Sequence, residues 1–474
     1  MRLAYIIAVV IGMVLTGCGG GAGRDSQQSA GSGSSVSSGS GPGSGSEAGS
    51  GSDPNPGIAD PSPTVAIDCG DAAILCVDDS VGTTQEFTTI QNAVSAARPG
   101  DRVVVHAGNY SGFSITTSGT ASAPIRVEAN GGSVVINRAG PSGDGVRLQD
   151  VSHVVIEGFD IRNSGTNSPR IFRCIAARGA TATSPMTGNV LRGNRCTNAD
   201  AEGIYVSQFG NGLIEQNVIS ASGASGAARS HGIYLANAGG DGTIIRANQI
   251  YGNANAESNG IHCNGDLSIG GDGLIQDITI ERNTIYGNGQ NGINLDGVQG
   301  ASIVNNLIYG NVRHAVRAYQ IDGASGPRDL IFINNTLLAD NAWSIKISED
   351  GGGHVVFNNI LSSTGSGGSL SVGHPSLVSN YNSTSDRMSA DDEATVISLT
   401  QWRSLTGADI NSRADARSQL FVDYASGDYR LAVTSPAIGA GRASLASVTA
   451  PTVDIVGVAR PQGDAHDIGA YESP

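Results

Sequence analysis

Short apolar segments that each contain a central asparagine recur along residues 190–361. The segments are VLRGNRC, LIEQNVIS, IIRANQIYGN, TIERNTIYGN, SIVNNLIYGN, IFINNTLLADN and VVFNNIL. Their central asparagines lie 23 to 35 residues apart, at Asn194, Asn217, Asn248, Asn283, Asn306, Asn335 and Asn359. Short β-branched segments with this irregular period are typical of a solenoid. We therefore predict an all-β fold, a single-stranded right-handed parallel β-helix, in which the asparagine has a structural role at the same bend of every coil.

A second recurring segment lies just before a loop of each coil. The copies are GVRLQ (145–149), CIAAR (174–178), GIYVS (203–207), GIYLA (232–236), GIHCN (260–264), GINLD (292–296), AVRAY (315–319) and SIKIS (344–348). Their second and fourth positions are apolar, and the period of two places them inside the solenoid. Cys263 is therefore expected in the core as a small apolar side chain. The first, third and fifth positions face outward.

The outward positions carry an unusual set of side chains for a solvated sheet. The third positions include Tyr205, Tyr234, His262, Asn294, Arg317 and Lys346, and the fifth positions include Arg178, Asn264, Asp296 and Tyr319. Parallel strands stack about 4.8 Å apart, so the row from Tyr234 to Lys346 spans roughly 19 Å. Longer inserts at 221–230, 265–274 and 320–329 are expected to wall a cleft. Tyrosines beside polar groups suit a polysaccharide, and we assign its binding to Tyr205, Tyr234, Asn264, Asn294, Asp296 and Arg178.

The ends of the solenoid are also visible in the sequence. Residues 88–101 (TTIQNAVSAARPGD) have one apolar face between a threonine and a Pro-Gly pair, which predicts a capping helix. We divide the chain into residues 63–101 as N-terminal cap, 102–362 as β-helix, and 363–474 as an irregular C-terminal cap.

The first residues predict export and lipidation. A charged start and an apolar run precede LTGC at 15–18, which resembles the bacterial lipoprotein box. By that resemblance residues 1–17 are a signal peptide and Cys18 becomes the lipidated N-terminus. Residues 18–62 form a Gly/Ser-rich linker with too few apolar side chains to fold. We expect an outer-membrane lipoprotein, facing the periplasm or the cell surface and attached to the membrane through its lipid only.

Charge and cysteine content narrow the function and the compartment. The net charge of −15 argues against nucleic acid as a partner. An anionic substrate must therefore be met by a local cationic patch, and Lys346 is the single lysine among 27 basic residues. Cys69 and Cys76 are expected to form a small disulfide loop in an oxidising compartment. Cys174 and Cys196 pair as well if the fold brings them together.

Two terminal segments carry a resemblance to a known family. FTTIQNAVSAARPGDRVVVHAGNYSG (87–112) resembles the opening segment of bacterial β-helix polysaccharide lyases of the chondroitinase B and alginate lyase type. Residues 428–472, which begin DYRLAVTSPAIGAG, resemble the closing segment common among β-helix carbohydrate-active proteins. The resemblance implies an enzyme that cleaves a uronic-acid polysaccharide by β-elimination. We expect the protein to be a monomer. The resemblance maps Lys346 to the base and Arg317 to the neutralising or acid role. It also implies Ca²⁺ bridging the uronate, for which Asp296 and Asp266 are the available carboxylates.

Other assignments remain open at this stage. His262 or Tyr319 could be the catalytic acid. If Arg317 and Lys346 both bind the carboxylate of the uronate, His262 or Tyr319 could instead be the base. An inverting glycoside hydrolase needs two carboxylates about 6.5–9.5 Å apart, whereas the outward face offers Asp296 with Asp266 nearby on a loop. A non-catalytic surface adhesin with a β-helix is a further alternative.

The lipid-anchor hypothesis predicts that Cys18→Ser releases the protein from the membrane fraction without loss of activity, because the substitution removes only the acceptor thiol. Fractionation followed by immunoblotting measures this. A Cys18→Ser protein that still sediments with membranes would contradict the anchor.

Overall fold

The computed structural model describes residues 67, 69–80, 87–165, 168–226, 229–374 and 376–473. The predicted signal peptide, Cys18 and the linker to residue 62 lie outside the described residues. The chain separates into two units, Met1–Ser52 and Asp53–Pro474, and the fold described here belongs to the second. Within the described part of the chain, no helix has both the length and the apolar character needed to cross a membrane.

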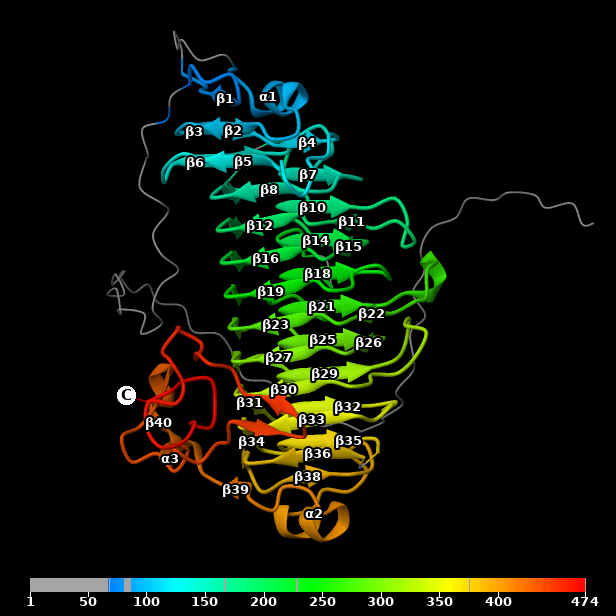
Figure 1. Cartoon of the computed structure of the whole chain (residues 1–474), viewed down its shortest axis with the longest axis vertical. Coiled ribbons are helices and arrows are strands. Elements are labelled where there is room, and N and C mark those ends of the chain that lie inside the picture. Colours follow the sequence, from blue (N-terminus) through cyan, green and yellow to red (C-terminus); the bar gives the residue numbers. More distant parts are fainter. Residues whose placement is uncertain are drawn as a thin grey trace, which may run out of the picture. The chain divides into compact units, whose positions relative to one another are not determined.

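Three long parallel sheets form the body of this unit (Figure 1). Sheet 1 contains β1 (Ile74–Val77), β2 (Arg102–Val105), β5 (Ile125–Ala129), β8 (Val154–Glu157), β12 (Val190–Arg192), β16 (Leu213–Glu215), β19 (Ile244–Arg246), β23 (Thr279–Glu281), β27 (Ser302–Val304), β30 (Ile331–Ile333), β33 (His354–Phe357) and β36 (Leu377–Asn380). Sheet 2 contains β3 (Gly108–Ser111), β6 (Val134–Arg138), β9 (Asp160–Arg162), β13 (Arg195–Thr197), β17 (Val218–Ser220), β20 (Gln249–Tyr251), β24 (Thr284–Tyr286), β28 (Leu307–Tyr309), β31 (Thr336–Asp340), β34 (Ile360–Thr364), β37 (Ser383–Thr384) and β39 (Arg413–Ala414).

Sheet 3 completes each coil. It contains β4 (Phe113–Ile115), β7 (Val146–Gln149), β10 (Ile175–Arg178), β14 (Ile204–Ser207), β18 (Ile233–Ala236), β21 (Ile261–Asn264), β25 (Ile293–Asp296), β29 (Val316–Tyr319), β32 (Ile345–Ile347), β35 (Leu370–Val372) and β38 (Met388–Ser389). The chain visits sheets 1, 2 and 3 in turn and then moves to the next coil. The predicted right-handed parallel β-helix is confirmed.

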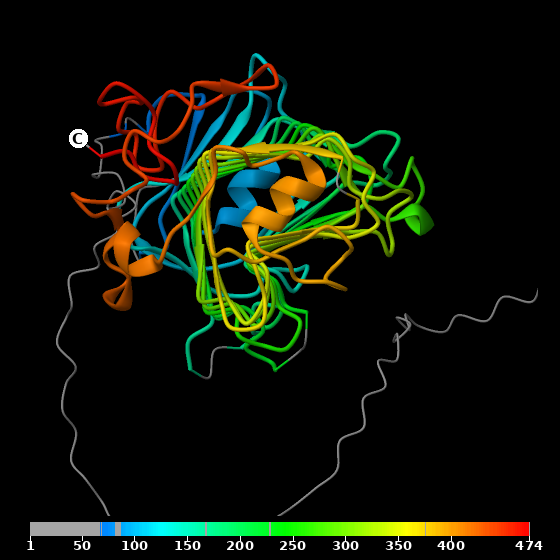
Figure 2. The ribbon, with the colours of Figure 1, turned by 90° about the horizontal axis from the view of Figure 1, so that it is seen from below.

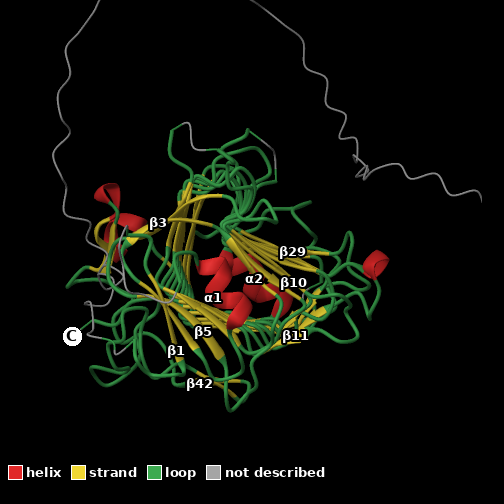
Figure 3. Cartoon of the chain, turned by 90° about the horizontal axis from the view of Figure 1, so that it is seen from above, coloured by secondary structure: helices red, strands yellow, loops and turns green. Residues whose placement is uncertain are grey.

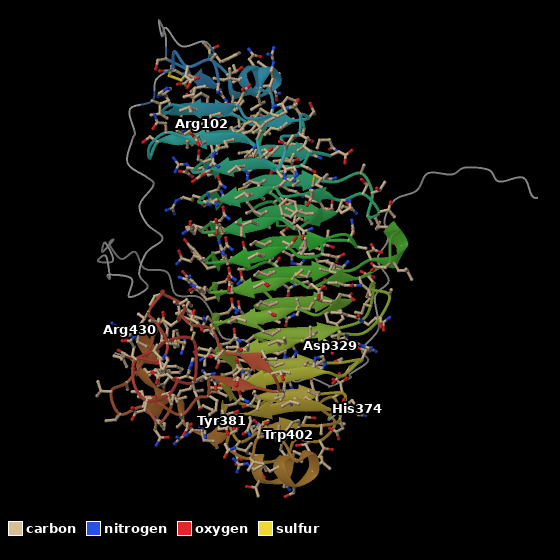
Figure 4. All side chains as sticks on the ribbon, viewed as in Figure 1. Arg102, Asp329, His374, Tyr381, Trp402 and Arg430 are labelled. Carbon is tan, nitrogen blue, oxygen red and sulfur yellow. A yellow bond between two sulfur atoms is a disulfide. The ribbon has the colours of Figure 1, made fainter. Side chains whose placement is uncertain are left out.

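A helix covers each end of the apolar interior. α1 (Ile90–Ala96) buries Ile90, Ala93 and Val94 at the first coil, and the Thr89 hydroxyl caps it by accepting from Asn92 N. α2 (Leu399–Thr406) buries Trp402 at the other end, with an exposed fraction of 0% (Figure 4). Figures 2 and 3 show both helices inside the outline of the coils. The predicted N-terminal capping helix is therefore confirmed.

A ladder of buried asparagines joins the coils at the turn between sheets 1 and 2. Each side-chain Nδ2 donates to Oδ1 of the asparagine one coil further on, at 2.9–3.1 Å, from Asn194 through Asn217, Asn248, Asn283, Asn306, Asn335 and Asn359 to Asn382. Each Oδ1 also accepts the backbone N–H of the previous asparagine, as Asn306 does from Asn283 at 3.0 Å. The predicted structural role of the repeated asparagine is confirmed.

Sheet 1 neutralises its own charges on its outer surface. Arginine and glutamate side chains alternate along successive coils and form a continuous series of ion pairs, at Arg102, Glu128, Arg126, Glu157, Arg192, Glu215, Arg246 and Glu281 (Figure 4 labels Arg102). This surface therefore offers little uncompensated charge to an ionic ligand.

The C-terminal region differs from the predicted irregular cap. The sheets continue past residue 362, because β35 to β39 still pair in parallel, and β1 likewise pairs before residue 102. Only α2 covers the end. The following chain instead returns along the coils, where Arg282 Nε donates to Ile455 O at 3.1 Å and Asn334 Nδ2 donates to Asp467 O at 2.9 Å. Its contacts with the turn residues of sheet 1 were not visible in the sequence pattern.

The cysteines follow the prediction in part. Cys69 and Cys76 form the expected disulfide. The predicted Cys174–Cys196 bond is wrong, because both residues are buried free thiols. They are close enough to hydrogen-bond, and burial, followed by the Cys174 thiol, raises the pKa of Cys196 well above its usual range. Both pack in the core as small apolar groups, as Cys263 does.

The asparagine ladder predicts a large local cost for Asn306→Ala. The variant leaves Asn283 N and Ile280 O, which bond to the Asn306 side chain at 3.0 and 2.8 Å, without partners in a buried turn. We expect the free energy of unfolding to fall by about 2–6 kcal/mol, from about 1–3 kcal/mol per unsatisfied group. Denaturant titration measures it. Asn109→Ala, at an exposed position, should change it by less than about 0.5 kcal/mol; equal effects would contradict the ladder's role.

Candidate functional site

The outward third positions of sheet 3 form one row. Strand register pairs Tyr205 with Tyr234, Tyr234 with His262, His262 with Asn294, Asn294 with Arg317 and Arg317 with Lys346. We call these six residues the sheet-3 ladder. The fifth positions align beside it, so that Asn264 pairs with Asp296 and Asp296 pairs with Tyr319. The structure therefore brings together the residues that the sequence alignment grouped.

Loops flank this face more closely than an open solvated sheet allows. Asn294 is 2% exposed and Lys346 keeps 16% of its side chain accessible. The inserts at 265–274 and 320–329 meet, since Leu267 N donates to Asp322 O and Ala324 N donates to Gly273 O, each at 3.0 Å. A pocket opens between them, lined by Asp266, Leu267, Ser268, Ile321 and Asp322. These inserts follow the strands of sheet 3, whereas the 221–230 insert precedes β18.

A second polar row stands just before the sheet-3 strands, and sequence reasoning missed it. Its members are His231, Asn259, Asn291, His314 and Trp343, and each side chain before Trp343 accepts the backbone N–H of the next member at 3.0–3.1 Å. The signal was a histidine or asparagine before Gly-Ile or Ala-Val in four consecutive copies. His231 and His314 accept through Nδ1, so their neutral rings carry the proton on Nε2.

The imidazoles on this face are neutral at ordinary pH. Burial lowers the pKa of His262 to about 4. Burial, together with nearby Lys346 and Arg317, lowers the pKa of His314 to about 3. Burial also holds the pKa of His231 well below its usual range. These side chains therefore act as uncharged hydrogen-bonding groups rather than as cations.

Arg317, Asn294 and Tyr319 form a compact group at the middle of the ladder. The Arg317 guanidinium lies 4.3 Å from the ring centre of Tyr319, and Asn294 Nδ2 donates to the Tyr319 hydroxyl at 2.7 Å. Burial raises the pKa of Tyr319, so its hydroxyl keeps a proton to donate. Arg317 Nε and, one rung beyond Asn294, His262 Nε2 are buried without a hydrogen-bond partner. Both nitrogens are therefore available to donate to a ligand.

Lys346 lies at the end of the ladder and is held by two carboxylates. Its Nζ forms an ion pair with Glu393, and Asp392 Oδ1 lies 3.6 Å away. Asp392 also accepts from the Ser348 hydroxyl at 2.8 Å. The two acidic residues come from a loop after β38 and both have positive φ, 53° and 73°. These two carboxylates therefore fix the position of the Lys346 side chain.

The carboxylates assigned to calcium have other uses. Asp296 accepts backbone N–H groups of Ile321, Asp322 and Gly323 at 2.8–3.2 Å, and so fixes the 320–329 loop. Asp266 accepts from Ser268 N and Oγ at 2.8 and 2.6 Å. Among the described residues, the only group of three or more Cys, His, Asp or Glu side chains close enough to share an ion is Cys69, Cys76 and His106, and it contains the disulfide. Asp296 and Asp266 therefore do not fit a calcium site.

Aromatic and arginine side chains dominate the other end of the ladder. The rings of Tyr205 and Tyr234 lie edge to face, with 5.5 Å between their centres. The centres of the Tyr234 and His262 rings lie 4.9 Å apart. The Arg178 guanidinium lies 5.0 Å from the ring centre of Tyr205. The predicted binding residues Tyr205, Tyr234 and Arg178 thus form one cluster, about three to five rungs from Arg317 at roughly 4.8 Å per rung.

Comparison with known proteins establishes the fold. Residues 228–384 match the family model described as right handed beta helix region. The crystal structure of pectate lyase Pel9A superposes with a TM-score of 0.56 at 15% identity, over 85% of this chain and 96% of that chain. No curated protein matches the chain by sequence.

Two further solved structures are more distant. An alginate lyase from Paenibacillus sp. str. FPU-7 has a TM-score of 0.43 at 18% identity, over 58% of this chain and 91% of that chain. A polygalacturonase from Erwinia carotovora ssp. carotovora has a TM-score of 0.44 at 12% identity, over 72% of this chain and 93% of that chain.

The neutral histidines predict a specific pH dependence of stability. His314 is uncharged in the fold down to about pH 3, whereas in the unfolded chain it binds a proton below its ordinary value of 6.5. The unfolded state then holds more protons, so stability falls as pH drops through this window. His314→Asn keeps the acceptor that Asn259 and Asn291 supply in the same row. We expect the fall in Tm between about pH 7 and about pH 4 to be smaller in this variant; an unchanged fall would contradict the buried neutral imidazole.

Proposed function

We propose that the protein is a polysaccharide lyase that cleaves a uronic-acid polymer by β-elimination on the outer face of sheet 3. The observation that carries the proposal is the pair of buried, unpartnered donors, Arg317 Nε and His262 Nε2, on either side of Asn294. An acidic sugar placed over Asn294 supplies oxygen acceptors to both. The fold shared with a pectate lyase supports this reading by analogy only.

Each step of β-elimination has a candidate group on this face. Among the described residues, Arg317 forms no ion pair with a carboxylate. Its guanidinium is therefore free to neutralise the carboxylate of the uronate, which makes the C5 proton more acidic. Tyr319, with its proton retained and its oxygen bonded by Asn294, suits protonation of the leaving oxygen at C4. The C5 proton passes to a base while the C4–O4 bond breaks, and the electron pair forms the C4–C5 double bond.

Lys346 remains the proposed base, adjacent to Arg317 in register. Its ion pairs with Glu393 and Asp392 hold the side chain in place. Lys346 must therefore leave these carboxylates to reach the C5 proton, which it accepts as the neutral amine. If the pairs persist, Lys346 joins Arg317 in clamping the carboxylate. His262 is less suited to the base role, because the Asn259 amide lies 3.4 Å from its Nδ1 and favours the ring with the proton on Nε2.

A hydrolase is the second candidate, and one observation favours it. Burial raises the pKa of Asp296, and the charge of Asp322 raises it further. An inverting glycosidase uses a carboxylic acid of raised pKa together with a second carboxylate. Against it, three backbone N–H groups already bind Asp296 and orient it towards the loop.

The proposal predicts ultraviolet-absorbing unsaturated products when the full chain is incubated with polygalacturonate, alginate or chondroitin. Lys346→Arg keeps the charge and removes the group able to lose a proton, so turnover should fall at least ~100-fold with little change in binding. Normal turnover in Lys346→Arg would assign Lys346 to the carboxylate clamp. The lyase proposal fails if chain breaks appear without absorbing products.

A matched variant separates the two roles of Lys346. Glu393→Gln removes the ion-pair partner of Lys346. If Lys346 must leave Glu393 to act as the base, turnover should rise in this variant. A lysine that only clamps the carboxylate would change the affinity for the polysaccharide and leave turnover near that of the wild type.

A further inference from the structure

Two arginines contact Tyr205 and a third lies nearby, at the end of the outer face away from Lys346. The Arg173 guanidinium lies 4.7 Å from the Tyr205 ring centre and 4.5 Å from that of Phe172, and Arg178 lies 5.0 Å from Tyr205. Arg147, the second residue of β7, lies one rung before Ala176 of β10. Burial lowers the pKa of Arg178, and Arg173 and Arg147 lower it further, since three like charges lie close together.

The charges of this cluster do not balance. Arg147 pairs with Asp144 at 2.8 Å, and Arg173 pairs with Glu202 at 2.6 Å. Arg178 takes part in none of the ion pairs found among the described residues, and its Nε is buried without a hydrogen-bond partner. A guanidinium that is partly desolvated beside two others is costly unless an anion joins it. On sheet 1, by contrast, successive arginines meet glutamates.

The cluster is far from the proposed point of cleavage but on the same face. Arg178 belongs to β10, which is separated from β29 and Arg317 by five steps of the sheet, so the two guanidinium groups stand roughly 24 Å apart at about 4.8 Å per step. Tyr205, Tyr234 and His262 occupy the rungs between them and present aromatic edges and faces to a sugar chain. A polymer lying along the ladder reaches both ends.

We propose that Arg178, supported by Arg147 and Arg173 around Tyr205, is a second anion subsite that binds an acidic group of the polysaccharide several sugars away from the bond at Arg317. The inference rests on the proposed function for the identity of the polymer. It makes chain length a determinant of affinity, because only a chain that spans the ladder gains the Arg178 contact. The acidic group is a carboxylate or a sulfate, and the guanidinium binds either through charge-assisted hydrogen bonds.

Binding measurements on the full chain test the subsite without requiring turnover. The probes are polygalacturonate, alginate, chondroitin and chondroitin sulfate, each as long chains and as di- or trisaccharides, titrated by calorimetry. Arg178→Gln should weaken binding of long chains about tenfold or more, as expected for loss of a hydrogen bond to a charged group. Short oligosaccharides held at Arg317 should bind the variant as they bind the wild type. A loss confined to chondroitin sulfate would identify sulfate as the acidic group.

The matched control is Arg162→Gln, which removes an arginine from β9 of sheet 2, where Arg162 pairs with Asp160. It should bind every probe as the wild type does, and the Tm of each variant shows that the fold is intact. Three results would overturn the subsite. Arg178→Gln could bind long chains as tightly as the wild type does, or lose as much affinity for short chains as for long ones. The wild type could also bind none of the probes. Length-dependent loss without unsaturated products would retain the subsite and reject the lyase activity.

Discussion

The amide hydrogen bonds between buried asparagines determine how the coils are stacked, and the functional face depends on that stacking. Each asparagine bonds to the same residue one coil away, so loops of very different length still return the chain to one register. Because the ladder holds the turns between sheets 1 and 2, the strands of sheet 3 repeat at the same interval. The side chains from Tyr205 to Lys346 therefore form one continuous row.

Charge is distributed unevenly between the sheets of the protein. The chain carries a net charge of −15, but its arginines on sheet 1 are matched by glutamates. On sheet 3 the balance is different, since Arg317 and Arg178 each have a buried, unpartnered Nε. An anion bound beside a partly desolvated guanidinium interacts with it more strongly than in water. Exposed charges elsewhere on the protein are screened within about 10 Å at ordinary salt.

Most of the fold and the membership of the ladder could be predicted from the sequence. A period of two in segments such as GIHCN and GINLD decides which side chains point inward, and the shared first residue aligns the strands. The contacts of Lys346 could not be predicted in this way. Glu393 reaches it from a loop whose backbone path depends on how the last coils pack, and no repeat carries that information. The three backbone N–H groups that donate to the Asp296 carboxylate could not be predicted either, since they depend on the geometry of the 320–329 loop.

The central claim is that the outer face of sheet 3 breaks a glycosidic bond by elimination and not by addition of water. Mass spectrometry of the products formed in isotopically heavy water tests this most directly. Elimination creates a double bond and adds no water across the broken bond, so after correction for exchange at the reducing end and at hydroxyl groups the masses of the fragments should sum to that of the substrate. Fragments that are heavier by one labelled water per cleavage would contradict the account and identify a hydrolase.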